Sequence, residues 1–201
     1  GATSKRGTRI AFRPDPTIFG KSLSFNPAVV RKRLEAKSYL HRGLKIVFKD
    51  SKTDERVEFH HPGGINEYLV SIINEHGKPA VHATHFSLDR AENPRLELAL
   101  AWTEGTDERI LSFANGIPTP SGGTHESGLK AAMNKALRTF MEANILVPKG
   151  VTVPAEDIPE GATAILSVYI AEPQFQGQTK DRLNNPEVTS QVESAVRPAL
   201  K

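Results

Sequence analysis

The most constraining feature of this sequence is an apolar segment at residues 163–170, which has the composition of a β-strand. Its side chains are apolar almost without interruption, whereas a strand with one wet face alternates apolar with polar residues. An uninterrupted run of this length is typical of a strand that is covered on both faces. The fold must therefore supply structure on each side of one central strand.

Four helices are expected in the chain, because apolar residues recur at helical spacing in four segments that carry start or stop signals. Asn26 and Pro27 form an N-cap and first-turn pair, and Gly77 with Pro79 closes a later helix. The apolar stripe of the longest helix contains Leu129, Met133, Leu137, Phe140 and Met141. The helices are predicted over residues 26–39, 65–76, 126–144 and from 186 onward.

Strands are predicted where apolar residues alternate with polar ones. Such alternation occurs at residues 8–13, and again at 44–48 and 57–59, which a polar connection joins into a β-hairpin. Residues 96–102 and 110–113 form the clearest strand pair, with a turn that contains glycine between them. Together with the helices, these segments predict an α+β fold with a mainly antiparallel sheet.

The composition limits the classes of protein and of site that are possible. The chain has 201 residues, a formal net charge of +3 and no cysteine, so one domain of moderate size is expected. The absence of cysteine excludes disulfides and thiolate metal sites. No apolar run approaches the roughly 20 residues of a membrane-spanning helix. The mild positive charge permits contact with nucleic acid or phosphate without requiring it.

Both ends of the chain are interpreted as cut. The two methionines are Met133 and Met141, so no initiator is present, and the last residues continue a helical pattern without a stop signal. We therefore expect a piece of a longer protein, some of whose chemistry lies in other domains.

Two pairs of histidines resemble parts of a metal site. His82 and His85 have a spacing that places two ligands together on a helix, but they lie in a segment predicted to be extended, where residues three apart face opposite sides. His60 and His61 are adjacent and lack a third ligand nearby. No metal ligand is assigned, and a small metallohydrolase built on His82, His85 and His125 is the least favoured alternative.

The segment from Gly122 to Glu126 (GGTHE) precedes the longest predicted helix. Two glycines allow unusual backbone angles there, and the free N–H groups at a helix start can receive an anion. The pattern is not a Walker phosphate loop. Two interpretations are open: an anion site, and a purely structural turn that starts the helix.

The best functional candidate is the polar loop at residues 174–180, which follows the buried strand. A lysine at the tip of such a loop, Lys180, can reach a phosphate outside its own domain as a compact point charge. Gln178 offers an amide donor beside it. The alternative is an ordinary solvated lysine, which is the common state of lysines in loops.

Two basic stretches are weaker candidates. Residues 31–33 (RKR) and the row formed by Lys130, Asn134 and Arg138 are expected on solvated helix faces. Few aromatic residues accompany them, so base stacking is not indicated. Contact with a DNA backbone, without readout of its sequence, is the functional alternative.

Four blocks of the sequence, in order along the chain, resemble the second, or transducer, domain of the ATPase subunit of bacterial type IIA topoisomerases, the family that contains gyrase and topoisomerase IV. The first is GTRIAFRPDPTIF at residues 7–19, and the second runs from RLE at 33–35 to LHRGL at 40–44. The third joins NGI to GGTHE at residues 115–126. The fourth, PQFQGQTK at residues 173–180, is similar to the family's Q-T-K loop, although Gln176 stands where many relatives carry an acidic residue.

The resemblance implies a fold and a division of the chain. The fold would be like the second domain of ribosomal protein S-five, with a left-handed βαβ crossover and a mixed, mainly antiparallel sheet packed on helices. Residues 1–19 would be a junction strand that leaves an N-terminal ATPase domain. Residues 20–201 would be the transducer domain, with a truncated C-terminal helix.

The resemblance also implies a function for the Q-T-K loop. In the family its Gln and Lys reach the γ-phosphate of ATP, and these roles carry over to Gln178 and Lys180. Lys180 would act catalytically by neutralising charge on the phosphate, and Gln178 would hydrogen-bond to it. ATP and Mg²⁺ would be bound mainly by the N-terminal domain. Release of the loop after hydrolysis would couple the ATP cycle to DNA strand passage and supercoiling, and the fragment alone is expected to be inactive.

Partners and a location follow from the same resemblance. The protein would pair with the gyrase A subunit in an A₂B₂ complex, contact the DNA backbone non-specifically, and form a homodimer through its ATPase domain. It would be cytoplasmic and nucleoid-associated, without membrane contact. A topoisomerase IV B subunit and a free-standing nucleic-acid-binding module of the same fold are the alternatives.

Overall fold

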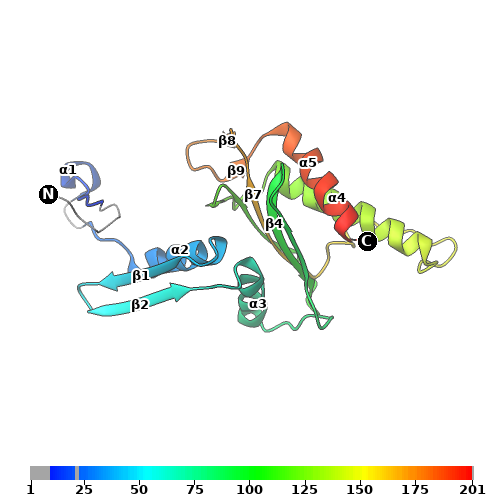
Figure 1. The fold of residues 1–201 in the computed structure, drawn as a ribbon, viewed down its shortest axis with the longest axis horizontal. Coiled ribbons are helices and arrows are strands. Elements are labelled where there is room, and N and C mark those ends of the chain that lie inside the picture. The colour runs from blue at the N-terminus through cyan, green and yellow to red at the C-terminus, as the bar shows by residue number, and fades with distance from the viewer. Residues whose placement is uncertain (1–9, 21–22, 201) are drawn as a thin grey trace.

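The computed structural model describes residues 10–20 and 23–200. Figure 1 shows an arm, which contains α2 and the β1–β2 hairpin, beside a larger body in which helices pack on a sheet. The elements are, in chain order, α1 (Pro16–Phe19), α2 (Pro27–Leu40), β1 (Lys45–Asp50), β2 (Glu55–His60), α3 (Ile65–His76), β3 (Phe86–Arg90), β4 (Arg95–Trp102), β5 (Arg109–Ala114), β6 (Ile117–Pro118), α4 (Thr124–Ala143), β7 (Ala162–Tyr169), β8 (Phe175–Gln176), β9 (Arg182–Leu183), α5 (Pro186–Val196) and the 3₁₀-helix η1 (Arg197–Leu200).

A five-stranded sheet forms the centre of the body, in the order β3-β4-β7-β5-β6. β7 is the middle strand, and it pairs antiparallel with β4 and parallel with β5. The remaining pairs, β3 with β4 and β5 with β6, are antiparallel. The predicted α+β class, with a mixed and mainly antiparallel sheet packed on helices, is therefore confirmed.

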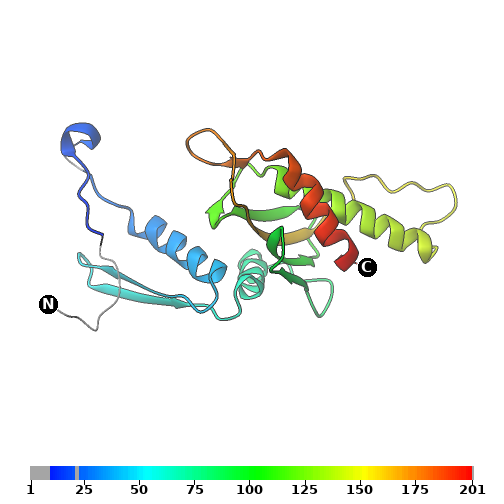
Figure 2. The same ribbon diagram turned by 45° about the horizontal axis from the view of Figure 1, so that its top comes forward.

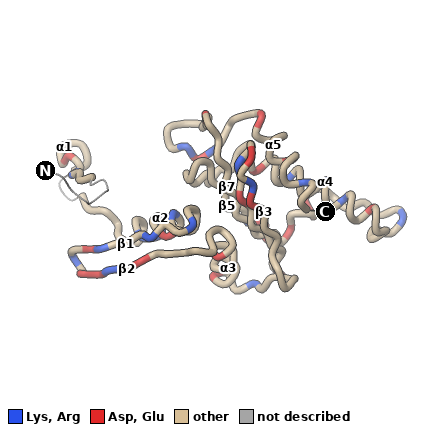
Figure 3. Tube along the Cα trace, in the orientation of Figure 1, with Lys and Arg blue, Asp and Glu red and all other residues tan. Residues whose placement is uncertain are grey.

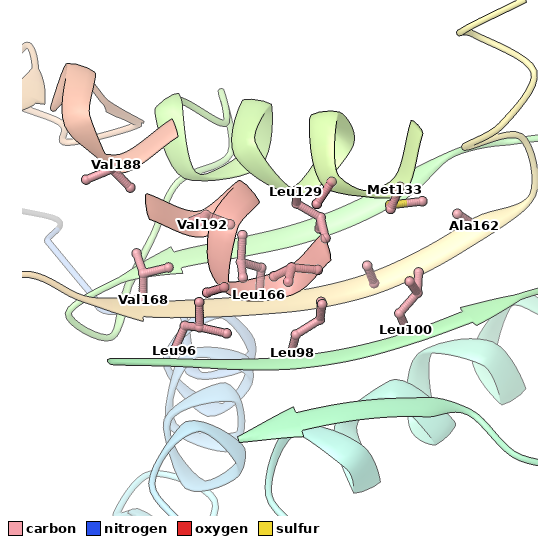
Figure 4. Close-up of a cluster of buried hydrophobic side chains, with 14 of the residues drawn as sticks. Leu96, Leu98, Leu100, Leu129, Met133, Ala162, Leu166, Val168, Val188 and Val192 are labelled. Carbon is pink, nitrogen blue, oxygen red and sulfur yellow. The ribbon is translucent and has the colours of Figure 1, made fainter. Parts of the chain in front are cut away.

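β7 is covered on both faces, as its continuous apolar run predicts. On one face Leu166 and Val168 pack with Leu98 of β4 against α4 and α5 (Figure 4). On the other face Ile165 packs with Leu69 of α3. All five of these side chains are fully buried, so helices shield the central strand from water on each side.

The pairing predicted between residues 96–102 and 110–113 is wrong, although both segments are strands. β7 lies between β4 and β5, so these two strands are not neighbours. The alternation in β4 places its leucines on one face, as expected, but alternation specifies a face of the sheet and not the adjacent strand. β5 pairs in parallel with β7 instead, and the connection between them includes α4.

The four predicted helices are confirmed as α2, α3, α4 and α5. The Asn26 side chain caps α2 by accepting hydrogen bonds from the N–H groups of Ala28 and Val29. Gly77 ends α3 in the left-handed conformation, with φ 64°. α5 ends at Val196, earlier than the helical pattern of the sequence predicts, and continues as the short helix η1.

α4 is the longest helix, and it packs against α5 and the sheet (Figure 1). Its predicted stripe is buried at Leu129 and Met133. Phe140 of the same stripe is 49% exposed, because the C-terminal end of α4 extends past the sheet in Figures 1 and 2. Among the described residues, no helix has both the length and the apolar character needed to span a membrane.

The arm consists of the predicted hairpin packed on α2. Phe59 of β2 is buried, and Ile46 and Phe48 of β1 on the same face are half-buried. Arg42, which follows α2, lies 3.2 Å from the Asp89 carboxylate of β3 and so ties the arm to the body. Figure 2 shows that the far end of the hairpin points away from the sheet.

The strand predicted at residues 8–13 is wrong for the part that the structure describes. Thr8 and Arg9 lie outside the described residues, and residues 10–13 form no strand. Ile10 and Phe12 are 83% and 74% exposed. A strand needs a neighbour for its backbone N–H and C=O groups, and no described segment pairs with residues 10–13. The short helix α1 follows, capped by the Asp15 side chain.

Candidate functional site

The predicted polar loop is a narrow excursion from the body, closed at its base by a two-stranded ladder. β8 and β9 form this ladder by pairing antiparallel. Gly177 and Lys180 take left-handed backbone angles, with φ 74° and φ 60°, and these angles turn the chain between the two strands. Gln178 and Lys180 therefore stand together at the tip of the loop.

Gln178 and Lys180 are both exposed. The Nζ atom of Lys180 lies 5.8 Å from the centroid of the Phe175 ring, a weak cation–π contact at an exposed site. Lys180 takes part in none of the ion pairs formed among the described residues. Its ammonium group is therefore available to an anion, as a phosphate contact requires.

Asn185 ties the two ends of the loop together from a buried position, 2% exposed. Its Oδ1 accepts a hydrogen bond from the N–H of Gln174 (2.7 Å), and its Nδ2 donates to the carbonyl of Glu172 (3.1 Å). The sequence predicts Asn185 only as the residue that starts the last helix. Its side chain in fact makes no cap bond to the backbone of α5, because Oδ1 is bonded to the loop. Nδ2 donates to the Glu187 carboxylate in the first turn of α5 (2.9 Å) as well as to Glu172.

The Gly122–Gly123 turn supports the loop from the other side. The N–H of Leu183 in β9 donates to the Gly122 carbonyl (3.1 Å), and the N–H of Ser121 donates to the Asp181 carbonyl (3.0 Å). A Cβ added at Gly123 would lie 2.3 Å from the Leu183 carbonyl oxygen. The glycines are buried against β9, which favours the structural interpretation of the GGTHE segment over an open anion site.

A buried polar network lies beneath this turn. The Thr119 hydroxyl donates to the Ser112 carbonyl (2.8 Å) and lies 3.0 Å from Nε2 of His125. Burial lowers the pKa of His125 to about 4, so its imidazole is neutral at pH 7. Because the Thr119 proton is already used, Nε2 of the neutral ring donates to Thr119. Nδ1 is then an acceptor, and it has no partner among the described residues.

His82 and His85, which the sequence marked as a pair, bind different elements. Nε2 of His82 accepts a hydrogen bond from the N–H of Trp102 (3.1 Å), whereas Nε2 of His85 lies 3.1 Å from Oδ1 of Asn66 in α3. His125 is held separately in the network of Thr119. In the part of the chain that the structure describes, no group of three His, Asp or Glu residues is arranged to hold a metal ion.

The two basic stretches lie on helix faces, as predicted. Arg31 of α2 pairs with Glu55 of β2 (2.5 Å), and Lys130 of α4 pairs with Glu108 (3.0 Å). Figure 3 shows acidic residues interspersed with basic ones along α2, the hairpin and the body. Neighbouring carboxylates therefore neutralise part of the positive charge of these stretches.

A groove with a volume of about 680 Å³ runs beside the loop, between α2 and the β5–β6 edge of the sheet. Apolar side chains such as Leu111 and Phe113 line it, together with Lys32 and Arg33 of α2 and Thr179 of the loop. The loop and the arm therefore share one surface, and a change in the position of either alters this groove.

Comparison with known proteins gives consistent matches. A family model described as DNA gyrase B matches residues 64–201. The B subunit of DNA gyrase from Myxococcus xanthus is 40% identical over 206 residues, which cover 100% of this chain and 24% of that protein. The B subunit of DNA topoisomerase 4 from Staphylococcus aureus is 40% identical over 205 residues, covering 100% and 31%. The chain thus spans about a quarter to a third of the length of these two relatives.

Solved structures agree with these matches. The 43K ATPase domain of Thermus thermophilus gyrase B superposes with a TM-score of 0.78 at 33% identity, covering 94% of this chain and 50% of that one. The ATP-binding domain of Francisella tularensis topoisomerase IV gives a TM-score of 0.75 at 30% identity, covering 92% and 49%. The fold and the sequence therefore define a segment of the B-type subunit of a type II topoisomerase. The chain belongs to the DNA gyrase B family.

Proposed function

We propose that this chain senses the γ-phosphate of ATP within a gyrase-type B subunit and transmits the loss of that phosphate to the DNA-handling parts of the enzyme. Gln178 and Lys180 are the proposed phosphate contacts, and Lys180 has the catalytic role of neutralising developing charge. The observation that carries the proposal is the ammonium group of Lys180, which pairs with no described carboxylate and stands at the tip of a loop held at both ends.

The chemistry of the tip suits a phosphate. Lys180 brings three N–H donors and a full positive charge, and Gln178 brings an amide donor. ATP and Mg²⁺ would be held mainly by a nucleotide-binding domain, and they supply the phosphoryl group and its compensating metal charge. The contribution of this chain is to place one cation and one amide where negative charge develops.

The two supports of the loop provide a route for coupling. Asn185 immediately precedes α5, and Gly123 immediately precedes α4. These helices pack so closely that a Cβ added at Gly128 of α4 would lie 2.5 Å from the carbonyl oxygen of Thr189 in α5. Loss of the phosphate contact would release the loop, and the N-terminal ends of both helices would shift together.

The wider assignments extend this proposal. We place the transducer domain over residues 20–201, within a protein that forms an A₂B₂ complex with the A subunit and a homodimer through its ATPase domain. Contact with DNA would be non-specific and directed to the backbone, through exposed basic residues such as Lys32 and Arg33. The complex would work in the cytoplasm, associated with the nucleoid.

A topoisomerase IV B subunit is the second candidate, because the Staphylococcus aureus topoisomerase 4 protein is as similar to this chain as the Myxococcus xanthus gyrase protein. The reactions of the reconstituted enzymes separate the two. ATP-dependent negative supercoiling of relaxed plasmid by the full-length protein with its A subunit supports gyrase. Decatenation without supercoiling supports topoisomerase IV.

Lys180→Ala in the full-length protein tests the phosphate contact. We expect a loss of ATPase activity of about tenfold or more, with supercoiling lost in parallel, because a charge that acts in the transition state is removed. Lys149→Ala is the matched control, since Lys149 is an exposed lysine on a different loop. Unchanged ATPase activity in Lys180→Ala would refute the proposed phosphate contact.

A further inference from the structure

We infer that the buried network of Ser112, Thr119 and His125 positions the phosphate-sensing loop, by holding the Gly122–Gly123 turn against β9. Thr119 and His125 are then positioning residues, which act on the phosphate through Lys180 and touch no nucleotide themselves. This inference rests on the proposed function of the loop, and it gives the GGTHE segment the role of holding that loop in position.

The network is continuous from the sheet to the helix. Ser112 belongs to β5, and its carbonyl accepts from both the N–H (2.9 Å) and the hydroxyl (2.8 Å) of Thr119. The Ser112 and Thr119 hydroxyls are 2.7 Å apart, and His125 in the first turn of α4 completes the chain of contacts at 3.0 Å. Ser112, Thr119 and His125 are all buried, so water cannot replace a bond that is lost.

The same residues hold the turn. The Thr119 carbonyl accepts a hydrogen bond from the N–H of Gly122 (2.8 Å), which closes the turn between β6 and α4. The Gly122 carbonyl faces the other way and accepts from the N–H of Leu183 in β9 (3.1 Å). Thr119 is therefore bonded to the network on one side and to the turn on the other, and the turn bonds directly to the base of the loop.

The fit between turn and loop leaves no room for a side chain. A Cβ at Gly123 would lie 2.3 Å from the oxygen and 2.7 Å from the nitrogen of Leu183, which are backbone atoms that cannot rotate away. A Cβ at Gly122 would lie 2.7 Å from a carboxylate oxygen of Glu126. A small shift of the turn is therefore passed to β9, two residues from Lys180.

Three variants of the full-length protein test the inference. Thr119→Val keeps the shape of the side chain and removes the hydroxyl that binds Ser112 and His125. Thr119→Ser restores the hydroxyl and is the rescue. Gly123→Ala drives a methyl into β9. Its control is Gly150→Ala, because Gly150 also has a positive φ (88°, against 139° at Gly123) but has nothing within 4 Å of its Cβ position.

Hydrogen exchange is the first measurement. The amide of Leu183 is bonded to Gly122, whereas the amide of Asn184 is bonded to Gln174 on the other side of the loop (2.8 Å). Thr119→Val and Gly123→Ala should speed exchange at Leu183 by about tenfold or more and leave Asn184 little changed. Thr119→Ser and Gly150→Ala should match the wild type at both amides.

ATPase kinetics are the second measurement. A misplaced Lys180 should lower kcat by about tenfold or more and leave KM little changed, because the rest of the nucleotide is held by another domain. In a double-mutant cycle, Thr119→Val should add no further loss to Lys180→Ala, since the network acts through that lysine. If Thr119 had only a structural role, the kcat losses of the two single variants would instead combine in full in the double variant.

The two proposals fail in different ways. Wild-type exchange at Leu183 in Thr119→Val, or a kcat loss that adds in full to that of Lys180→Ala, overturns the positioning role. If Lys180→Ala keeps full ATPase activity, the phosphate contact is overturned, while exchange at Leu183 still decides whether the network positions the loop. If Gly123→Ala does not fold, Thr119→Val and its serine rescue decide the question alone.

Discussion

Gly128 lets α4 and α5 approach each other, and its replacement by alanine sets two effects of opposite sign against each other. In an isolated helix the change from Gly to Ala raises stability by about 1 kcal/mol. Here the new methyl group would lie 2.5 Å from the carbonyl oxygen of Thr189 and 2.9 Å from Cβ of Val192. The helices must then separate, at a cost near the upper end of the roughly 1–3 kcal/mol seen for overpacking. We therefore expect Gly128→Ala to lower the free energy of unfolding by about 2 kcal/mol.

Urea denaturation followed by tryptophan fluorescence measures this loss. The chain has one tryptophan, Trp102, whose indole N–H donates to the Ile158 carbonyl (3.2 Å) at the edge of the main core. Ser194→Ala is the control, because Ser194 is exposed on α5 and the change should raise stability by only a few tenths of a kcal/mol. A Gly128→Ala chain that is as stable as the wild type, or more stable, would refute the close packing of the two helices.

Two other perturbations have definite signs. Asn185→Ala removes the bonds to Gln174, Glu172 and Glu187 and should lower the free energy of unfolding by about 2 kcal/mol in the same urea titration. Asn185→Asp keeps the acceptor for Gln174 but sets a second carboxylate beside that of Glu187, so it should not restore the stability of the wild type. The pKa of His125 is about 4 in the folded chain against an ordinary 6.5, so between these values the unfolded chain binds a proton that the folded chain does not. The free energy of unfolding is therefore highest above pH 6.5 and falls by about 3 kcal/mol in total as the pH drops toward 4. Urea midpoints at pH 7 and pH 5 check this, and a fall as large in His125→Gln as in the wild type would contradict it.

Much of the secondary structure could be predicted because its signals are local. Asn26 and Gly77 mark helix ends through hydrogen bonds and backbone angles that involve only nearby residues. The polar loop was also predictable, since its composition and its place after a buried strand needed no knowledge of distant contacts. The strand expected at residues 8–13 shows the limit of such signals, because a strand exists only where another strand completes its backbone hydrogen bonds.

The supports of the candidate site were not predictable in the same way. Asn185 followed by Pro186 looks like a helix start, and its side chain is instead drawn to Gln174 and Glu172 on the far side of the loop. Thr119 carries no sequence signal of its own, because its role depends on the burial of His125 beside it. The two glycines could be identified as special, but only the approach of β9 explains why Gly123 carries no side chain, whereas a Cβ at Gly122 would meet the Glu126 carboxylate of α4.

By itself, the sequence determined that one strand is buried on both faces, that the chain contains four main helices, and that a lysine-tipped loop follows the strand. These are properties of composition and spacing, which act over a few residues. The tertiary structure alone decided that β7 lies between β4 and β5, although it follows them by many residues in the chain. It also decided that the Gly122–Gly123 turn holds the loop through Leu183. Neighbours in a sheet and close backbone contacts are set by the packing of the whole core, so no single segment encodes them.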